Sequence, residues 1–477
     1  MESTTLCYLS AVQLAKMIRQ RELSPVEVIE AFLNRIEQIN PLINAYCTLA
    51  PEQAYQVARE AEAKQMSGEE LGPLHGVPVS IKDLTPTAGI RTTFGSRIFE
   101  HHVPTQDAVI VEKIKAAGAI VLGKTNTPEF GAGANTFNDI FGSTRNPWRL
   151  THTPAGSSGG AAAALAAGLC PLAEGSDLGG SLRTPASFCG VVGLRPSIGR
   201  VTNYPSLIAW DSLAVNGPMA RTVEDVALML SVIAGRDDRS PLSVSAAPGE
   251  FLAGTRQPEI KGWRVAWSPD LGFAPVDEEV VNLCQQALSV FKNELDCKVE
   301  VATPDLHDAP YIFQTLRAGA LVAMYGNRLA LWREQMQPNL VWNIEQGLKL
   351  SAADIGRAQI ARSMLWDRVR RFFETYDLLL VPAAATLPFL CEVISPSQVG
   401  GRQMSNYVEW LGLTYGITVT GLPSICVPCG WSADGLPVGL QIVGRRLDEA
   451  SILQAAAAFE RAQPWSDRYL LLTGELS

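Results

Sequence analysis

Residues 153–187 read TPAGSSGGAAAALAAGLCPLAEGSDLGGSLRTPAS and hold two short clusters of glycine and serine. The first cluster is GSSGG at 156–160 and the second is GGS at 179–181, with an alanine-rich run between them. Small residues in this pattern are typical of a flexible linker, a phosphate-binding loop or a catalytic centre. The residues around the two clusters decide which of the three this chain forms.

The alanine-rich run argues against a linker, because a linker would be polar and structureless on both sides. The stretch SSGGAAAALAAG at 157–168 predicts a closely packed helix with a glycine entry. That helix does not account for Gly179 and Gly180, which place backbone N–H groups beside the hydroxyl of Ser181. An oxyanion hole requires N–H groups next to a nucleophile, so the second cluster is a candidate catalytic centre.

A stretch upstream, GAIVLGKT at 118–125, matches the P-loop pattern G-x-x-x-x-G-K-[ST]. In a P-loop the strand precedes the first glycine, and the four variable residues wrap a phosphate. Here those residues are Ala, Ile, Val and Leu, which predict the strand itself. Asn126, Thr127 and Pro128 follow, so no helix begins there with its N–H groups directed at an anion. We therefore do not expect nucleotide binding.

Short apolar strands alternate with helices along the chain. The expected strands are residues 75–83, 119–123, 263–267, 298–302, 377–382, 424–428 and 438–443. The expected helices are residues 9–18, 25–40, 51–66, 107–118 and 277–293. This order implies an α/β fold with a large mixed, mainly parallel twisted sheet and helices on both faces. A Pro/Ser/Gly-rich stretch at 236–262 predicts a long surface connection.

The overall composition is that of a globular protein, since 47% of the 477 residues are hydrophobic and 18% are charged. A net charge of −9 argues against nucleic acid or an anionic membrane as the main partner. The opening residues lack the apolar region of a signal peptide, and no apolar run of about 18 residues predicts a membrane span. Nine scattered cysteines form no disulfide framework, so we expect a reduced, cytoplasmic protein.

Two common kinds of site are disfavoured by their surroundings. Cys426 and Cys429 have C-x-x-C spacing, but no second pair or histidine lies close and no helix begins inside the motif. We therefore expect these two cysteines to be structural. The five histidines belong to no G-x-S-x-G or H-E-x-x-H motif, so a hydrolase with this sequence needs a base other than histidine.

Lys82 is a candidate base, because it ends the apolar run VPVSI at 77–81. A solvated lysine is charged at neutral pH, whereas burial disfavours the ammonium and makes a neutral amine available. A lysine at a strand end can equally bury its stem and keep its charged head in water. The partner of this lysine, which the residues alone do not identify, decides between the two.

Three segments together resemble the amidase signature family of serine hydrolases, which use a Ser–cisSer–Lys triad. They are GVPVSIKD (76–83), AGSSGG (155–160) and SDLGGSLRTPASFCGVVGLRPSIGR (176–200). Further matches at 123–131, 141–148, 216–230 and 421–445 extend the resemblance over nearly the whole chain. The resemblance implies the amidase signature fold as one domain over 1–477, with a signature core at 70–230 and a more variable, pocket-forming region at 236–350.

The resemblance also implies a role for each motif position. Ser181 matches the acylated nucleophile, Ser157 the serine that follows a cis peptide bond and passes the proton, and Lys82 the base. The implied reaction is acylation of the nucleophile with release of an amine or ammonia, followed by hydrolysis. Backbone N–H groups of the oxyanion hole match Leu178, Gly179, Gly180 and Ser181. Supporting positions match Ser158, Asp177 and Arg183.

The leading hypothesis is a stand-alone hydrolase of carboxylic amides, with esters and carbamates as further candidates. It implies neither a metal nor an organic cofactor, a small-molecule amide as partner, and a homodimer as the candidate assembly. Expected substrate-binding residues are Gly131, Asn135, Phe137, Tyr204 and Trp210. Beside them an aromatic stripe at 305–345 predicts a pocket for apolar or aryl amides, although such a stripe also occurs in protein cores.

The alternative hypothesis is the glutaminase subunit of a glutamine-dependent aminoacyl-tRNA amidotransferase complex, which passes ammonia to a partner. Thr184 stands where those subunits often carry glutamine, and this departure weakens the alternative. A charged substrate of this kind needs an arginine and an acid in the pocket. The sequence does not identify an arginine that faces the pocket.

Overall fold

An 11-stranded sheet runs through the molecule, which a computed structural model describes over residues 3–247, 249–469 and 472. Its strands are β1 (Tyr46–Leu49), β2 (Pro78–Lys82), β3 (Ile120–Thr125), β6 (Leu172–Asp177), β7 (Val192–Arg195), β8 (Val215–Ala220), β9 (Arg264–Trp267), β10 (Lys298–Val301), β11 (Leu378–Pro382), β14 (Ser424–Trp431) and β15 (Pro437–Val443). In space they follow the order β1-β3-β2-β6-β8-β7-β14-β15-β11-β9-β10. The short strands β4 (Phe137–Asn138), β5 (Gly142–Ser143), β12 (Gln398–Val399) and β13 (Arg402–Gln403) form two small ribbons.

Strand directions in the large sheet are mixed. The pairs β2–β3, β2–β6, β9–β10 and β9–β11 are parallel, and the remaining neighbours are antiparallel. The expected large mixed sheet is thus confirmed, whereas the expected predominance of parallel pairs does not hold. Antiparallel strands need only a short loop between them, as at 432–436 between β14 and β15, while parallel strands need a longer crossover.

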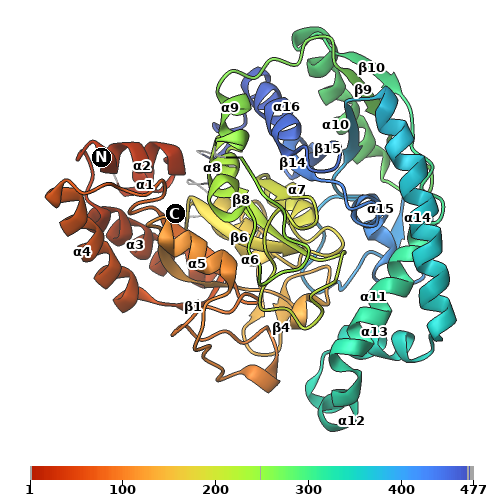
Figure 1. Cartoon of the computed structure of the whole chain (residues 1–477), viewed down its shortest axis with the longest axis horizontal. Coiled ribbons are helices and arrows are strands. Elements are labelled where there is room, and N and C mark those ends of the chain that lie inside the picture. Colours follow the sequence, from red (N-terminus) through yellow and green to blue (C-terminus); the bar gives the residue numbers. More distant parts are fainter. Residues whose placement is uncertain (1–2, 248, 470–471, 473–477) are drawn as a thin grey trace.

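Helices cover both faces of the sheet, as expected (Figure 1). Their bounds are α1 (Ser3–Cys7), α2 (Ala11–Arg19), α3 (Pro25–Ile43), α4 (Pro51–Ser67), α5 (Val109–Ala116), α6 (Gly159–Ala166), α7 (Arg183–Cys189), α8 (Val223–Ile233), α9 (Glu250–Arg256), α10 (Glu278–Ser289), α11 (Ala309–Tyr325), α12 (Leu329–Trp332), α13 (Pro338–Leu348), α14 (Ala352–Thr375), α15 (Gly412–Thr418) and α16 (Glu449–Ala462). The alternation of side chains along β11 separates two apolar cores. Leu378 and Leu380 join one core with α10 and α16, and Leu379 and Val381 join the other with α11 and α14.

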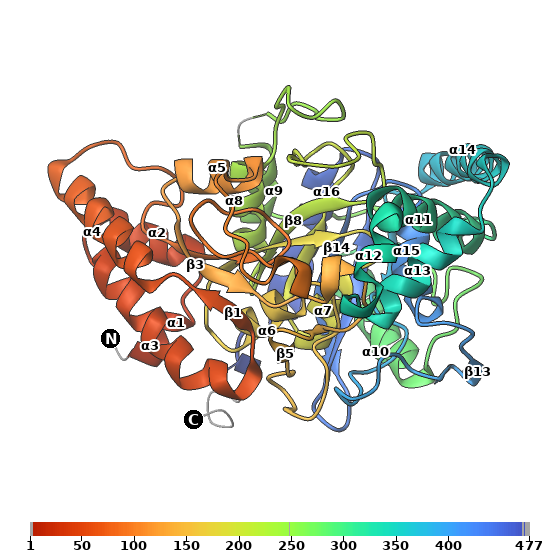
Figure 2. The same cartoon turned by 90° about the horizontal axis from the view of Figure 1, so that it is seen from below.

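The helices at the two ends of the molecule come from distant parts of the chain. Both views place α1–α4 at one end and α11–α14 at the other, with the central strands between them (Figures 1 and 2). The helices α11–α13 occupy the stretch in which the sequence indicated only an aromatic stripe. The central strands therefore lie between two groups of helices, one from the start of the chain and one from residues 309–375 (Figures 1 and 2).

Three local expectations can be compared with the structure. The P-loop-like stretch forms β3, which confirms the expected strand. Cys426 and Cys429 are buried in β14, and the sulfur of Cys284 in α10 lies 3.8 Å from that of Cys429. The segment 236–262 is not a connection throughout, because α9 forms within it and buries Phe251 in the core.

No helix among the described residues is long and apolar enough to cross a membrane.

Candidate active site

The strand order of the sheet brings the expected triad residues to one place. Lys82 is the last residue of β2, and Asp177 is the last residue of the neighbouring parallel strand β6. The carboxyl ends of parallel neighbours lie at the same edge of a sheet, so the lysine meets the loop that carries Ser181. Ser157 shortly precedes the close-packed helix α6, whose residues are all buried.

The amine of Lys82 lies within a cluster of serine hydroxyls. Its Nζ is 2.7 Å from the Oγ of Ser157, 2.8 Å from that of Ser158 and 3.0 Å from that of Ser176. The side chain is fully buried, so the charged head is not in water. Ser176 was not among the expected residues, since a single serine near a strand end carries no signal in the sequence.

Burial lowers the pKa of Lys82 to about 7, because an ammonium group loses its hydration in the interior. The negative charges of Glu174 and Asp177 act in the opposite direction. Glu174 is also fully buried, burial raises the pKa of its carboxyl, and its Oε2 accepts a hydrogen bond of 3.1 Å from the backbone N–H of Lys82. The lysine can therefore present a neutral amine near neutral pH, which is the form that a base needs.

Close packing determines the path of the chain at Ser157. The peptide bond between Gly156 and Ser157 is cis. A Cβ at Gly156 would lie 2.9 Å from the backbone carbonyl carbon of Asn135, so only glycine fits there. Ala155 precedes this bond with a φ of 58°, and its side chain is buried.

The loop from Leu178 to Ser181 is shaped by two glycines. A Cβ at Gly179 would lie 2.7 Å from the ring of Phe313, and Gly180 has a φ of 131°, a conformation that favours glycine. The hydroxyl of Thr414 donates a hydrogen bond of 2.7 Å to the carbonyl of Gly179. The loop is thus fitted between its own strand and the C-terminal part of the chain.

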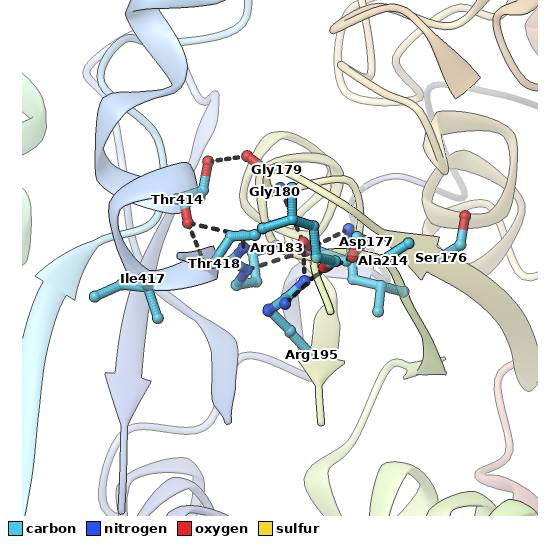
Figure 3. A network of polar contacts seen from close by, with 12 residues as sticks. Ser176, Asp177, Gly179, Gly180, Arg183, Arg195, Ala214, Thr414, Ile417 and Thr418 are labelled. Carbon is cyan, nitrogen blue, oxygen red and sulfur yellow. Dashed lines mark hydrogen bonds and ion pairs between the residues drawn. The ribbon is translucent and has the colours of Figure 1, made fainter. Parts of the chain in front are cut away.

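Asp177 holds this loop through an ion-pair network, which Figure 3 shows. Its carboxylate accepts hydrogen bonds from the N–H groups of Gly180 (2.9 Å) and Leu182 (3.1 Å). It also pairs with Arg183 at 2.9 Å and with Arg195 at 3.0 Å, and all three charged side chains are fully buried. Burial alone would raise the pKa of Asp177, but the two guanidinium groups outweigh it and hold that pKa well below its usual range.

Two residues of this network extend or alter the expectation from sequence. Arg195 was not expected at the site, although it lies within the quoted motif VGLRPSIGR. Gly180 was expected to give its N–H to an oxyanion hole, but that N–H already donates to Asp177. Arg183 reaches further and donates hydrogen bonds of 2.9 Å to the carbonyl of Thr414 and to the side chain of Gln441. The network thereby ties the loop to α15 and β15.

A cavity of about 240 Å³ opens above this arrangement. On one side it is lined by Ser157, Ser176 and the loop from Leu178 to Ser181. On the opposite side, α11 and the segment 407–411 contribute Phe313, Arg317, Leu321, Met324, Tyr325, Tyr407, Val408 and Leu411. A second cavity of about 360 Å³ adjoins the first, and Ile208 and Asp211 line both.

The expected substrate-binding residues are only partly gathered at this cavity. Gly131 lines it. Asn135 is buried elsewhere and donates to two backbone carbonyls of a neighbouring loop, and Phe137 lies in β4. Tyr204 and Trp210 are exposed, and Trp210 lines the second cavity instead. These four side chains lie outside the lining of the catalytic cavity.

The aromatic stripe divides in a similar way. Phe313 lines the cavity and stacks on Tyr415, with 4.7 Å between the ring centroids. Tyr325 lines it too and packs against Phe130 at 4.5 Å. The remaining members of the stripe, Tyr311, Trp332 and Trp342, lie outside this lining. Helical spacing alone could not separate the members that line the cavity from the others.

Comparisons with known proteins identify the family of this chain. Residues 27–453 match the family model described as Amidase. An acylamidase of Rhodococcus erythropolis is 40% identical over 98% of this chain and 98% of its own length. A glutamyl-tRNA(Gln) amidotransferase subunit of Thermosynechococcus vestitus is 35% identical over 95% of this chain and 98% of its own. The crystal structure of a bacterial aryl acylamidase of the amidase signature family superimposes with a TM-score of 0.91 at 32% identity, covering 98% of this chain and 99% of the other.

Proposed function

The chain belongs to the amidase family and is an amide-hydrolysing enzyme, and from this premise we propose that it works through an acyl-enzyme on Ser181. The observation that carries the proposal is the contact of 2.7 Å between the buried amine of Lys82 and the hydroxyl of Ser157, beside the loop that ends at Ser181. A buried amine of lowered pKa with a hydroxyl as its partner is suited to proton transfer.

In the proposed reaction, neutral Lys82 takes the hydroxyl proton of Ser157, which in turn takes that of Ser181. The oxygen of Ser181 attacks the amide carbon, and the C–N bond breaks as the proton returns through Ser157 to the leaving nitrogen. Water then attacks the acyl-enzyme by the same proton route, and this step releases the carboxylic acid and restores the serine. Acylation thus transfers the hydroxyl proton of Ser181 to the leaving amine, and water supplies its replacement during deacylation.

The developing negative charge on the carbonyl oxygen requires N–H donors that are aimed at it. Because the N–H of Gly180 is engaged by Asp177, we assign the oxyanion hole to the N–H groups of Gly179 and Ser181, with Leu178 beside them. The ion pairs of Asp177 keep these groups in place as the charge forms. Donors that are held before the reaction cost no reorganisation during it.

The proposed substrates are small apolar or aryl amides, and the same attack would also cleave esters and carbamates. The rings of Phe313 and Tyr325 and the side chains of Leu321 and Met324 supply apolar surface in the cavity. Two of the similar proteins are an acylamidase and an aryl acylamidase, which supports this substrate class. The nine cysteines, all free, support a reduced cytoplasmic setting.

The glutaminase subunit is the second candidate, supported by the 35% identity to an amidotransferase subunit. An arginine and an acid, Arg317 and Asp211, both line the cavity. However, the carboxylate of Asp211 already accepts hydrogen bonds from the N–H groups of Leu213 (3.0 Å) and Ala214 (3.4 Å). These two bonds fix the position of the carboxylate and leave it further lone pairs, so an assay has to separate the two candidates.

One assay on the purified full chain separates the two candidates. We expect the chain alone to release 4-nitroaniline from 4-nitroacetanilide and to leave glutamine intact. The Ser181→Ala variant should lose this activity by about 10⁴-fold or more, because the nucleophile is removed. Hydrolysis of glutamine without hydrolysis of any anilide would favour the amidotransferase role instead.

A further inference from the structure

The catalytic cavity contains a buried cation that the proposed reaction does not use. Arg317 lies in the middle of α11, lines the cavity and is only 7% exposed. It stands one helical turn beyond Phe313, whose ring packs against the oxyanion loop at Gly179. Arg317 therefore lines the same cavity as the loop that carries Ser181.

Protein groups pair with only some of the hydrogen-bond donors of Arg317. Its Nη2 donates to the Oδ1 of Asn343 in α13 and to the hydroxyl of Tyr407, the latter at 2.6 Å, and both groups are neutral. The rings of Phe313 and Tyr407 lie 5.8 Å and 5.5 Å from the guanidinium carbon. Within the described part of the chain, Arg317 pairs with no carboxylate, and its Nε and Nη1 donate to no protein group.

The other buried arginines of this molecule are met by carboxylates or by backbone carbonyls. Arg183 pairs with Asp177 at 2.9 Å, and Arg200 pairs with Glu449 at 2.8 Å. The remaining buried arginines donate to a carboxylate or to backbone carbonyls. A buried guanidinium group is costly unless an anion or several acceptors meet it. Arg317 differs from them in that it lines the catalytic cavity, where such an acceptor can enter with the substrate.

We propose that Arg317 binds a carboxylate carried by the substrate, so that the preferred amides have an apolar or aryl body with one acidic group. The body lies on Phe313 and Tyr325, the amide carbon lies at Ser181, and the acid meets the free guanidinium hydrogens. This inference rests on the proposed function and refines it. A charge-assisted hydrogen bond to a guanidinium group adds both affinity and orientation.

The test compares substrates that differ by a single carboxylate. One pair is 4-methylacetanilide and 4-acetamidobenzoate, with the acid on the amine side; the other is butyranilide and succinanilate, with the acid on the acyl side. We expect the acidic member of at least one pair to have the higher kcat/KM, by about 10- to 100-fold. Equal or lower values for both acidic members would overturn the proposal.

Variants then show whether Arg317 causes the preference. Arg317→Gln should abolish it, mainly through KM, and should lower kcat/KM far more for the acidic member of a pair than for its neutral partner, whereas Arg317→Lys should keep part of the preference. The matched control is Arg328→Gln, which removes a partly exposed charge just beyond the same helix, outside the cavity lining, and should keep the preference. An equal loss on neutral and acidic substrates in Arg317→Gln would show a structural role and overturn the proposal.

Binding to the inactive Ser181→Ala chain separates this inference from the proposed reaction. By calorimetry, the acidic substrate should bind about 10-fold or more tightly than its neutral partner, and the added Arg317→Gln change should remove the difference. This result would stand even if hydrolysis failed. Equal binding of the two substrates would reject the carboxylate site while leaving the amidase reaction intact.

Discussion

The two walls of the catalytic cavity come from different parts of the chain and differ in how their charged side chains are paired. The signature wall, residues 156–195 together with Lys82, pairs Asp177 with both Arg183 and Arg195, and the N–H groups of Gly180 and Leu182 donate to the same carboxylate. The helical wall, α11 and the segment 407–411, carries Arg317, whose only hydrogen-bond partners among the described residues are the amide of Asn343 and the phenol of Tyr407. In the first wall, both arginines are already paired with a carboxylate before a substrate arrives. The second leaves one charge for the substrate to balance.

This difference separates the chemistry of the reaction from the choice of substrate. A fixed set of ion pairs holds the loop of Ser181 whatever amide is bound. A wall with an unmatched charge can favour one class of amide over another without changing the bond that breaks. Substitutions in the signature wall are expected to have larger effects than substitutions in the helical wall.

The largest effect is expected at Lys82. Lys82→Ala should lower kcat/KM for 4-nitroacetanilide by about 10³-fold or more, because the proton of Ser157 then has no acceptor. In the unmodified enzyme, the rate should rise as the pH passes through about 7 and level off above it, since the neutral amine is the active form. A rate that falls over this range, or a variant of nearly normal activity, would remove Lys82 as the base.

Asp177→Asn should lower stability and should also loosen the oxyanion loop that Asp177 holds. The change leaves Arg183 and Arg195 buried without their carboxylate and should lower the free energy of unfolding by about 3–5 kcal/mol. Chemical denaturation measures this loss. The control is Asp305→Asn, an exposed carboxylate paired with His307 and Arg368, which should cost less than about 1 kcal/mol. Equal losses in the two variants would refute the idea that the signature wall depends on its buried ion pairs.

The smallest effect is expected on the helical wall, where Arg317→Gln should act mainly on the preference for acidic over neutral amides. If that variant lost as much stability as Asp177→Asn, the two walls would be equivalent and the comparison between them would fail. Denaturation of the Arg317→Gln and Asp177→Asn variants under the same conditions decides this point.

The signature wall could be anticipated from sequence because its residues lie in short, dense motifs. Lys82, Ser157 and Ser181 each sit beside glycines or an apolar strand that restrict where the side chain can be. Sequence could not indicate that the N–H of Gly180 is engaged by Asp177, since this depends on how the loop closes on its own carboxylate. The contact between the hydroxyl of Ser176 and the amine of Lys82 also became visible only in the structure.

The helical wall could not be predicted from the sequence, because its pattern of residues fits more than one structure. An aromatic stripe at helical spacing fits a core as well as a pocket, and both occur here: Phe313 lines the cavity, whereas Trp342 does not. Arg317 gave no signal, because the direction of its side chain depends on how α11 packs against α13 and the segment around Tyr407. Likewise, the alternation of strands and helices predicted the sheet but not the balance of parallel and antiparallel pairs.

The most direct test of the central claim is to identify the residue that becomes covalently modified. Incubation of the full chain with a fluorophosphonate, followed by peptide mapping with mass spectrometry, should place one label per chain on Ser181. Lys82→Ala should slow that labelling, because the serine is then no longer activated. A label on Ser157 or on another residue, or hydrolysis that continues after complete labelling, would contradict the assignment of Ser181 as the nucleophile.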